Sequence, residues 1–399
     1  MLIHRLKVAG LLSFGPQGID LPLEPLNVLI GPNGSGKSNL LEVLALLKAS
    51  PTNLPEPVKE MGGVKEWLWK GSGSKREASI DAVVDYPKGR AKVRHVLEMT
   101  EHGGRFEVTD ERIENERPDP GKDDAYFYYR FQKGHPALND LSKTRRGLRR
   151  ENVKPEESIL SQVRDPESYP VLHWLQEQYG GIRLYRNWAF GPSAAWRREQ
   201  SAQGRGDVLS DGGENMALVL SKIRARVKNE LIESLRKLFD GIVDIHLTVD
   251  GGNVLLFLEE SGGREIPATR LSDGTLRYLS LLAILLHPDP PPLVAIEEPE
   301  LGLHPDVIPH VAELLVSASQ RMQLVVTTHS RMLVDALSEQ PSSVVVCAKE
   351  NGESFQKVFH RSEVALQRPG LHHQWSTGGE LGPTVPTFQH PPRLRSYEC

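Results

Sequence analysis

Short apolar runs separated by polar turns predict a chain in which strands and helices alternate. At its beginning the pattern predicts strands over Ile3–Phe14, Ile19–Leu23 and Asn27–Ile30, followed by a helix over Asn39–Lys48. The run from Leu26 to Ile30 is mostly apolar, which is typical of a strand buried on both faces. This opening predicts an α/β fold.

The rest of the chain repeats these signals. Apolar side chains recur every three or four residues between positions 214 and 239, so this segment is expected to be a helix with one buried face. A hairpin is expected around Asp250-Gly251-Gly252-Asn253 and another over residues 344–359. No internal repeat and no sustained heptad pattern is found. Further strands are expected over Ala78–Tyr86, Lys92–Thr100, Ala125–Phe131, Leu293–Ile296 and Leu324–Thr328.

Composition narrows the classes of function. The 399 residues are 39% apolar, enough for a sizeable core, and no apolar stretch approaches the roughly 20 residues of a membrane span. A signal peptide's apolar segment is missing, so a cytoplasmic protein without a membrane partner is expected. The two cysteines offer neither a disulfide framework nor a metal site.

The net charge of −4 excludes a generally basic surface that coats nucleic acid. Two local basic segments remain candidates, residues 143–150 and the cations of the helix between Arg224 and Lys237. For each of them a solvated surface is the simpler interpretation, and a phosphate-binding patch is the alternative.

Residues Gly31–Ser38 form a complete GxxxxGK[ST] phosphate loop between a predicted strand and a predicted helix. Glycines let backbone N–H groups wrap a polyphosphate, Lys37 supplies a charge for the β and γ phosphates, and Ser38 offers a hydroxyl to Mg²⁺. The sequence therefore predicts binding of a nucleoside triphosphate with Mg²⁺. The residues expected to contact it are Asn33, Gly34, Ser35, Gly36, Lys37, Ser38 and Asn39.

Acidic residues and a histidine follow two later predicted strands. Glu297 and Glu298 end the strand Leu293–Ile296, and we expect Glu297 to hold the metal and Glu298 to orient and deprotonate the attacking water. His329 follows Leu324–Thr328, where it is expected to donate to the γ-phosphate. A structural histidine is the alternative, and the metal and base roles of the acidic pair can be shifted by one position.

A turn at Leu271-Ser272-Asp273-Gly274-Thr275 precedes a predicted helix over Leu276–Leu286. Such a turn is weak evidence by itself, because Ser-Asp-Gly is common turn and N-cap sequence. Its position after the phosphate loop and before the acidic pair is the order found in ATP-binding-cassette ATPases.

The chain resembles the ABC-type ATPases of the RecF, SMC and OLD group, most closely the compact RecF-like predicted ATPases of bacteria, often filed under AAA-type ATPases. The resemblance implies a two-lobed ABC-type head with an inserted middle region and no coiled coil. It also implies a homodimer or higher oligomer in which Ser272 and Gly274 contact the γ-phosphate bound by the other subunit, while Leu301–Pro305 links the two sites. Besides the phosphate loop, the resemblance is carried by Arg270–Tyr278, Ile296–Pro305 and Thr327–Ser330, with weaker support from Tyr185–Gly191 and Asn215–Leu220.

The same resemblance implies a division of the chain and further contacts. Residues 1–50 would form the first lobe, 51–266 an inserted β-rich and helical region, and 267–399 the second lobe with a Pro-, Gly- and His-rich tail. A glutamine at the lobe junction would contact Mg²⁺, and Gln162 is the candidate, with Gln132 behind it. Adenine contacts would come from near Arg5 and Ser13.

The expected function is an ATP-hydrolysing switch with Glu298, His329 and Lys37 as catalytic residues, coupled to DNA or to a separately encoded effector such as a nuclease. The resemblance implies a setting in DNA repair or antiphage defence. Two alternatives stay open: a nucleotide-gated regulatory subunit with little turnover, and the ATPase subunit of a transporter.

Overall fold

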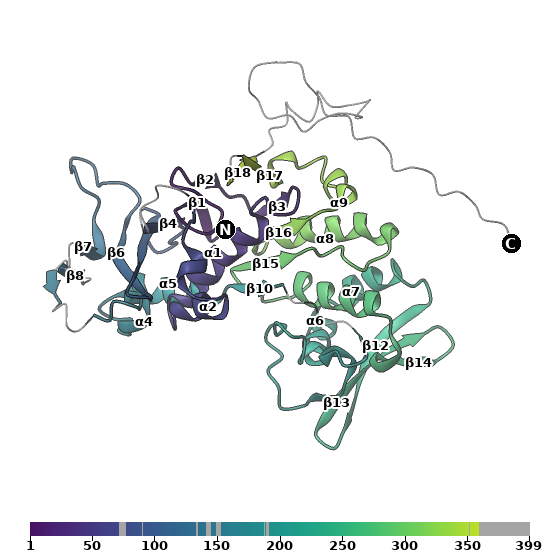
Figure 1. The fold of residues 1–399 in the computed structure, drawn as a ribbon. Coiled ribbons are helices and arrows are strands. Elements are labelled where there is room, and N and C mark those ends of the chain that lie inside the picture. Colours follow the sequence, from purple (N-terminus) through teal and green to yellow (C-terminus); the bar gives the residue numbers. More distant parts are fainter. Residues whose placement is uncertain are drawn as a thin grey trace, which may run out of the picture.

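The computed structural model describes residues 1–71, 77–89, 91–132, 135–140, 145–148, 153–186, 188, 191–350 and 352–358. A six-stranded sheet lies at the centre (Figure 1), and its strands are parallel except at the β18 edge. The mixture of parallel strands and helices confirms the α/β class. In spatial order the strands are β10 (Arg183–Tyr185), β15 (Leu293–Glu297), β16 (Gln323–Thr328), β3 (Leu26–Ile30), β17 (Val344–Glu350) and β18 (Glu353–Val358).

Two hydrophobic cores pack against opposite faces of this sheet. Along β15, Leu293 and Ala295 belong to one core, whereas Val294 and Ile296 belong to the other. Successive side chains of a strand point to opposite faces, so the sheet separates the two cores and contributes to both. Continuous burial of β3, β15 and β16 follows from this arrangement.

The first core joins the central sheet to α1 (Lys37–Ala49), α5 (Pro170–Gly180) and an eight-stranded antiparallel sheet. The short helices α2 (Pro55–Glu60), α3 (Val64–Trp67) and α4 (Ile159–Gln162) complete this side. The strands of the second sheet, in spatial order, are β2 (Ile19–Pro22), β1 (Ile3–Ala9), β4 (Glu77–Val84), β5 (Val93–His102), β6 (Arg105–Asn115), β7 (Phe127–Gln132), β8 (His135–Asn139) and β9 (Arg145–Gly147).

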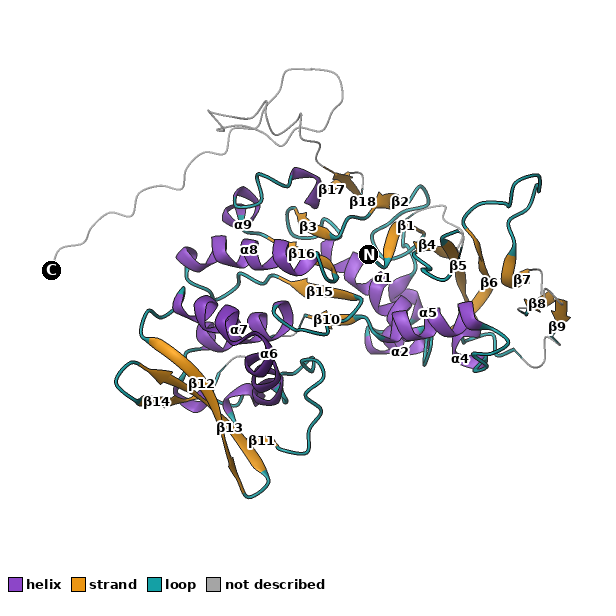
Figure 2. Ribbon diagram, turned by 180° about the vertical axis from the view of Figure 1, so that it is seen from behind, coloured by secondary structure: helices purple, strands orange, loops and turns teal. Residues whose placement is uncertain are grey.

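The second core is built by α6 (Met216–Arg236), α7 (Asp273–Leu285), α8 (Ile308–Ser319) and one residue of α9 (Arg331–Asp335). A smaller antiparallel sheet closes its outer side, as the view from behind shows (Figure 2). Its strands are β11 (Gln200–Ser201), β12 (Ile242–Asp250), β13 (Asn253–Glu260) and β14 (Arg264–Pro267). Short 3₁₀ turns lie at Ala195–Arg197, Ala268–Arg270, Pro305–Val307 and Pro341–Ser343.

Most of the predicted elements are confirmed, and the differences include the following. The strand expected over Ile3–Phe14 ends at Ala9, because Gly10 has a φ of +68° and turns the chain. The strand β6 was not predicted, since charged residues dominate its sequence. The helix between positions 214 and 239 is broken at Val227, whose φ of −135° is not helical.

Some expectations fall outside the described residues. These are the ends of the basic segment at 143–144 and 149–150 and the tail after residue 358. Within the described part of the chain, no helix combines the length and the apolar character of a membrane span.

Candidate nucleotide site

Most of the predicted site residues, those of the phosphate loop, the acidic pair and His329, gather at one edge of the central sheet. The strands β15, β16 and β3 are neighbours and parallel, so their carboxyl ends meet at the same edge. The loops that leave this edge carry the phosphate loop, the acidic pair and His329. In open parallel sheets this edge is where ligands bind.

The phosphate loop has the backbone that its glycines predict. Gly34 and Gly36 have φ angles of +75° and +93°, which favour glycine, and a Cβ on Gly34 would meet nothing within 4 Å. The hydroxyl of Ser35 is buried and has no hydrogen-bond partner. The 13-residue helix α1 begins at Lys37, within the last two residues of the motif, so its free N–H groups and dipole face the loop. An open cradle with an unpaired buried hydroxyl fits a polyphosphate.

The side chain of Lys37 folds back over the phosphate loop. Its Nζ donates to the carbonyl oxygens of Gly31 at 2.8 Å and Pro32 at 3.0 Å, and the residue is 6% exposed. Burial lowers the pKa of the Lys37 ammonium, and the charges of Glu298 and Glu297 oppose this effect. The ammonium is thus held between the loop and the acidic pair, where a phosphate would lie.

The two residues assigned to Mg²⁺ are in direct contact. Ser38 Oγ donates to Glu297 Oε1 at 2.6 Å, although 259 positions separate them in the sequence. A hydroxyl and a carboxylate are oxygen ligands of the kind that Mg²⁺ uses together with substrate phosphates. The donor set therefore fits Mg²⁺. Among the described residues, no cluster of three or more His, Cys, Asp or Glu side chains offers a metal site of its own.

A second pair joins the proposed base and the histidine. His329 Nε2 lies 3.6 Å from Glu298 Oε1, and both side chains are partly exposed. Glu300, which sequence analysis gave no role, accepts hydrogen bonds from Thr328 Oγ1 at 2.5 Å and from the backbone N–H of His329 at 3.1 Å. Glu300 thereby fixes the end of β16 against the segment Glu297–Glu300, which we call the acidic loop. Its place two residues after Glu298 was the available sequence signal.

Asn39 connects the phosphate loop to Ser13 and, through Ser13, to Ser354. Its Nδ2 donates to Ser13 Oγ at 2.5 Å, and Ser13 Oγ also accepts from Ser354 Oγ at 2.7 Å. Ser354 was not predicted as a site residue; a Cβ on Gly36 would lie 2.6 Å from its hydroxyl. The hairpin of β17 and β18 therefore packs directly on the phosphate loop. Ser13 lies here, whereas Arg5 is paired with Asp20 on β2.

The signature loop, which we define as Leu271–Thr275, opens α7. Ser272 is its N-cap and accepts from the Thr275 N–H at 3.1 Å. A Cβ on Gly274 would lie 2.7 Å from the Gly302 carbonyl oxygen, so this loop rests on the 301–305 loop of the same chain. The side-chain hydrogen bonds described for Ser272 stay within the signature loop, and none reaches Gly31–Ser38.

Asp273 is compensated by a neighbouring cation. Arg197 Nη2 donates to its carboxylate at 2.6 Å, and the Gly191 N–H donates from 3.2 Å. These hydrogen bonds hold the pKa of Asp273 below its usual value. The negative charge next to the signature serine is therefore paired within the chain.

Gln162 is engaged away from the acidic pair. It ends α4, where its Oε1 accepts from the Lys154 N–H at 2.9 Å and its Nε2 donates to the carbonyl oxygens of Glu157 and Ser158. The structure therefore ties Gln162 to a local turn and gives it no hydrogen bond with Ser38 or Glu297. Gln132 ends β7.

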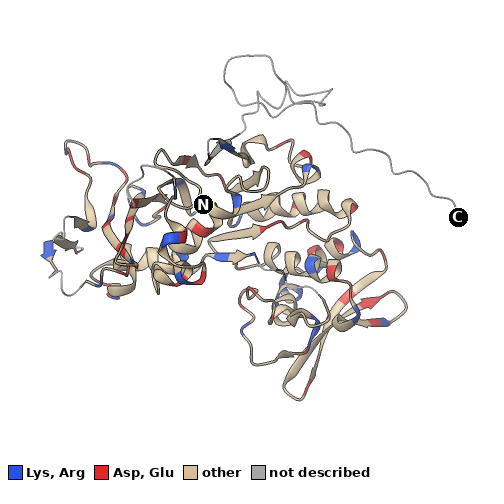
Figure 3. Cartoon of the chain, in the orientation of Figure 1, with Lys and Arg blue, Asp and Glu red and all other residues tan. Residues whose placement is uncertain are grey.

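The predicted basic helix is largely neutralised. Arg224 and Lys228 both pair with Asp244, and Arg226 pairs with Asp289. The positions of acidic and basic residues are interspersed along the ribbon of this region (Figure 3). This pairing favours the interpretation of α6 as a solvated, ion-paired surface.

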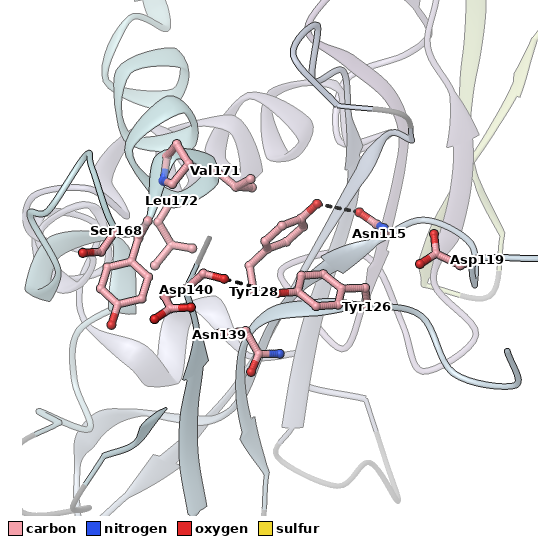
Figure 4. Close-up of a pocket in the computed structure, with 11 residues that line it drawn as sticks. Asn115, Asp119, Tyr126, Tyr128, Asn139, Asp140, Ser168, Val171 and Leu172 are labelled. Atoms are coloured by element: carbon pink, nitrogen blue, oxygen red, sulfur yellow. Dashed lines mark hydrogen bonds between the residues drawn. The ribbon is translucent and has the colours of Figure 1, made fainter. Parts of the chain in front are cut away.

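A hollow of about 390 Å³ lies on the outer part of the eight-stranded sheet, near the start of α5. Figure 4 shows Tyr126 and Tyr128 between Asn115 and Asp140. The phenol of Tyr128 donates to Asn115 Oδ1 at 2.7 Å, and burial raises its pKa to about 12. Among the described residues that line this hollow there is no lysine or arginine.

Comparison with known proteins agrees with this site. A family described as "AAA domain, putative AbiEii toxin, Type IV TA system" matches residues 26–335, which is more than half of the chain. No curated protein matches the sequence. The matched segment contains the phosphate loop, the signature loop, the acidic pair and His329.

Solved structures of SMC head domains share the fold. An Smc head bound to the C-winged helix domain of ScpA is similar with a TM-score of 0.58 and 14% identity, covering 91% of this chain and 99% of that one. The Smc head with an extended coiled coil from Pyrococcus furiosus, bound to the C-terminal domain of ScpA, gives 0.55 and 13%, covering 91% and 98%. An Smc head with coiled coil and joint from Pyrococcus yayanosii gives 0.55 and 11%, with the same coverages. Together with the family match, these findings confirm the resemblance to the RecF, SMC and OLD group of ABC-type ATPases.

Proposed function

The chain belongs to the AAA-domain family that matches residues 26–335, and from this premise we propose that it is an ATP-hydrolysing molecular switch of the RecF and OLD type. One observation carries the proposal. The Ser38–Glu297 pair and the Glu298–His329 pair stand at the same sheet edge as an open phosphate loop. This combination provides binding, a metal position and a general base together.

Each residue has one role in this mechanism. Backbone N–H groups from Gly34 to Ser38 and the ammonium of Lys37 bind and orient the triphosphate. Ser38 and Glu297 hold Mg²⁺, which when bound neutralises phosphate charge. The carboxylate of Glu298 accepts the proton of the attacking water, and His329 donates a hydrogen bond toward the γ-phosphate.

The active form in this proposal is a dimer. In this proposal the two cores correspond to the two lobes of an ABC-type head without a coiled coil, and the division at residues 50 and 266 stays a prediction. Ser272 and Gly274 contact the γ-phosphate bound by the partner subunit, through an isologous interface. The ion pair of Asp273 with Arg197 supports this role, because it removes a charge that would repel phosphate.

The switch acts on DNA or on a separately encoded effector protein, in DNA repair or antiphage defence. The Smc heads that were solved with ScpA domains are a precedent for a head domain that docks a partner protein. In this proposal the dimer closes with ATP and opens after hydrolysis, and the partner responds to this change.

The test compares wild type with Glu298→Gln. Turnover is expected to fall by about 100-fold or more, because a general base contributes 10²–10⁴-fold. ATP binding is expected to persist, and light scattering should show a more stable dimer with ATP and Mg²⁺. Glu313→Gln, which changes a carboxylate on α8 that is 74% exposed, is the matched control.

Unchanged turnover in Glu298→Gln would contradict the assigned base. Wild-type turnover should be repeated with duplex DNA, where stimulation supports DNA as the activator. An ATP-dependent dimer without measurable turnover would favour a nucleotide-gated regulatory subunit instead.

A further inference from the structure

A buried arginine lies under the signature loop. Arg277 is the fifth residue of α7, and it is 0% exposed. Its guanidinium donates through Nη2 to the carbonyl oxygen of Glu298 and through Nε to that of Pro299 at 3.4 Å. Through Arg277, the helix α7 therefore binds the main chain of the acidic loop.

Trp188 contacts both Arg277 and the acidic loop. The Arg277 guanidinium lies 4.3 Å from the centre of the Trp188 ring, within the range of a cation–π contact. The indole Nε1 of Trp188 donates to the carbonyl oxygen of Glu297 at 2.9 Å. Three successive carbonyls, those of Glu297, Glu298 and Pro299, are thus held by two side chains.

The held segment has an uncommon backbone. Glu298 has a φ of +46°, in the left-handed region that a glutamate rarely adopts. Its N–H donates to the Thr327 carbonyl at 2.9 Å, which ties the same residue to β16. A left-handed residue without glycine's freedom persists only where its surroundings hold it. The contacts of Arg277 and Trp188 are such surroundings.

Arg277 keeps its charge in this position. Burial lowers the pKa of its guanidinium to about 10, so it stays protonated at neutral pH. The charges of Glu300 and Glu298 oppose the effect of burial, and the guanidinium donates to two carbonyl oxygens and lies over an aromatic ring. The acidic loop cannot shift without disturbing this charge.

We propose that Arg277 and Trp188 are positioning residues that fix the carboxylate of Glu298 for hydrolysis and couple it to the signature loop. The inference rests on the proposed function. Engagement of Ser272 and Gly274 by the partner's nucleotide acts on α7, and α7 carries the Arg277 contact to Glu298. Closure around one site therefore promotes hydrolysis in the other without being required for it.

Trp188→Phe tests this inference, because it removes the indole N–H and keeps an aromatic ring. Trp196→Phe is the matched control: Trp196 stacks 6.2 Å from Trp188 and is 2% exposed, but its Nε1 has no hydrogen-bond partner. We expect kcat to fall about tenfold in Trp188→Phe with KM for ATP unchanged, since small misplacements cost 10–10²-fold. Trp196→Phe is expected to keep the wild-type kcat.

Arg277→Lys provides a second variant, which keeps the charge but lacks the planar group that contacts two carbonyls and the ring. Arg277→Lys is expected to lower kcat, and the accompanying change in KM for ATP is expected to be smaller. In a Glu298→Gln background, Trp188→Phe should leave ATP affinity unaltered, because positioning a missing base has no effect on binding.

The outcomes separate the inference from the proposed function. Wild-type turnover that depends on Glu298 but falls equally in Trp188→Phe and Trp196→Phe overturns the inference alone. A raised KM with unchanged kcat in Trp188→Phe also overturns it. A wild type without Glu298-dependent turnover overturns both, since no hydrolysis would remain to be positioned.

Discussion

The face of the central sheet that carries the phosphate loop and the face that carries the signature loop use their polar side chains differently. On the first face, Lys37, Asn39 and Ser38 bind to other parts of the site within the same chain. On the second face, Ser272 is exposed and its side chain only caps its own helix. One face is already assembled, whereas the other presents a loop to its surroundings.

The difference teaches where a second subunit would be needed. Phosphate binding requires nothing that the first face lacks. The signature loop, in contrast, is held from beneath by Gly302 and by the Asp273–Arg197 pair. Its exposed side offers a serine at the N-terminus of a 13-residue helix, which is a suitable contact for an anion from another molecule.

The largest effect is expected from Lys37→Ala. ATP affinity should fall by about 100-fold, because charge-assisted hydrogen bonds to phosphate are lost. Lys48→Ala, at the other end of α1 and 3.7 Å from Asp211, is the control and should bind normally. Isothermal titration with ATP and Mg²⁺ measures both.

The two faces can be compared further by mixing Lys37→Ala protein with Ser272→Asp protein. Aspartate is also a good N-cap, so α7 should remain stable while a negative charge faces the partner's phosphate. Each variant alone should be inactive. A mixture should regain turnover, because a mixed dimer has one intact composite site. No recovery in a mixture that is shown to form mixed dimers would contradict shared sites.

A smaller effect is expected from Gln323→Ala at the opposite edge of the sheet. The buried Gln323 accepts from the N–H groups of Leu2 and Ile3 and donates to the carbonyls of Ile3 and Glu24. Unsatisfied buried groups should lower the free energy of unfolding by about 3 kcal/mol.

The change should loosen the first face selectively. Hydrogen exchange is expected to increase in β1 and to stay unchanged in α7. Gln320→Ala changes an exposed glutamine three positions earlier, and its stability should match wild type. Equal loosening of both faces would show that the two cores do not open separately.

The smallest effect is expected from Arg197→Gln, which leaves Asp273 uncompensated. ATP-driven dimerisation should weaken about two- to fivefold, the range of a partly exposed ion pair. Because the pair lowers the pKa of Asp273 in the folded state, its contribution is present above the carboxyl's ordinary pKa and is lost as the pH falls below it. Light scattering at pH 7 and at a pH well below 3.8, the ordinary pKa of the carboxyl group, measures this, with Arg205→Gln as control. Stronger dimerisation of Arg197→Gln would refute the compensating role.

By itself, the sequence determined the chemistry of the site and much of its framework. The phosphate loop, the acidic strand end and the strand before His329 are local patterns whose residue types are dictated by backbone geometry and charge. The buried strands β3, β15 and β16 were likewise predictable, because strands covered on both faces are continuously apolar.

Only the tertiary structure decided which of these pieces meet. Ser38 contacts Glu297, and Arg277 and Trp188 hold the main chain at Glu297 and Glu298. These contacts join residues that are far apart in the sequence, so no local sequence pattern predicts them. The left-handed φ of Glu298 is a further case, since a glutamate predicts the opposite and packing overrides it. The order of strands in the sheet, in which β15, β16 and β3 are adjacent and parallel, brings the ends of these strands together, and the sequence of each strand by itself does not determine that order.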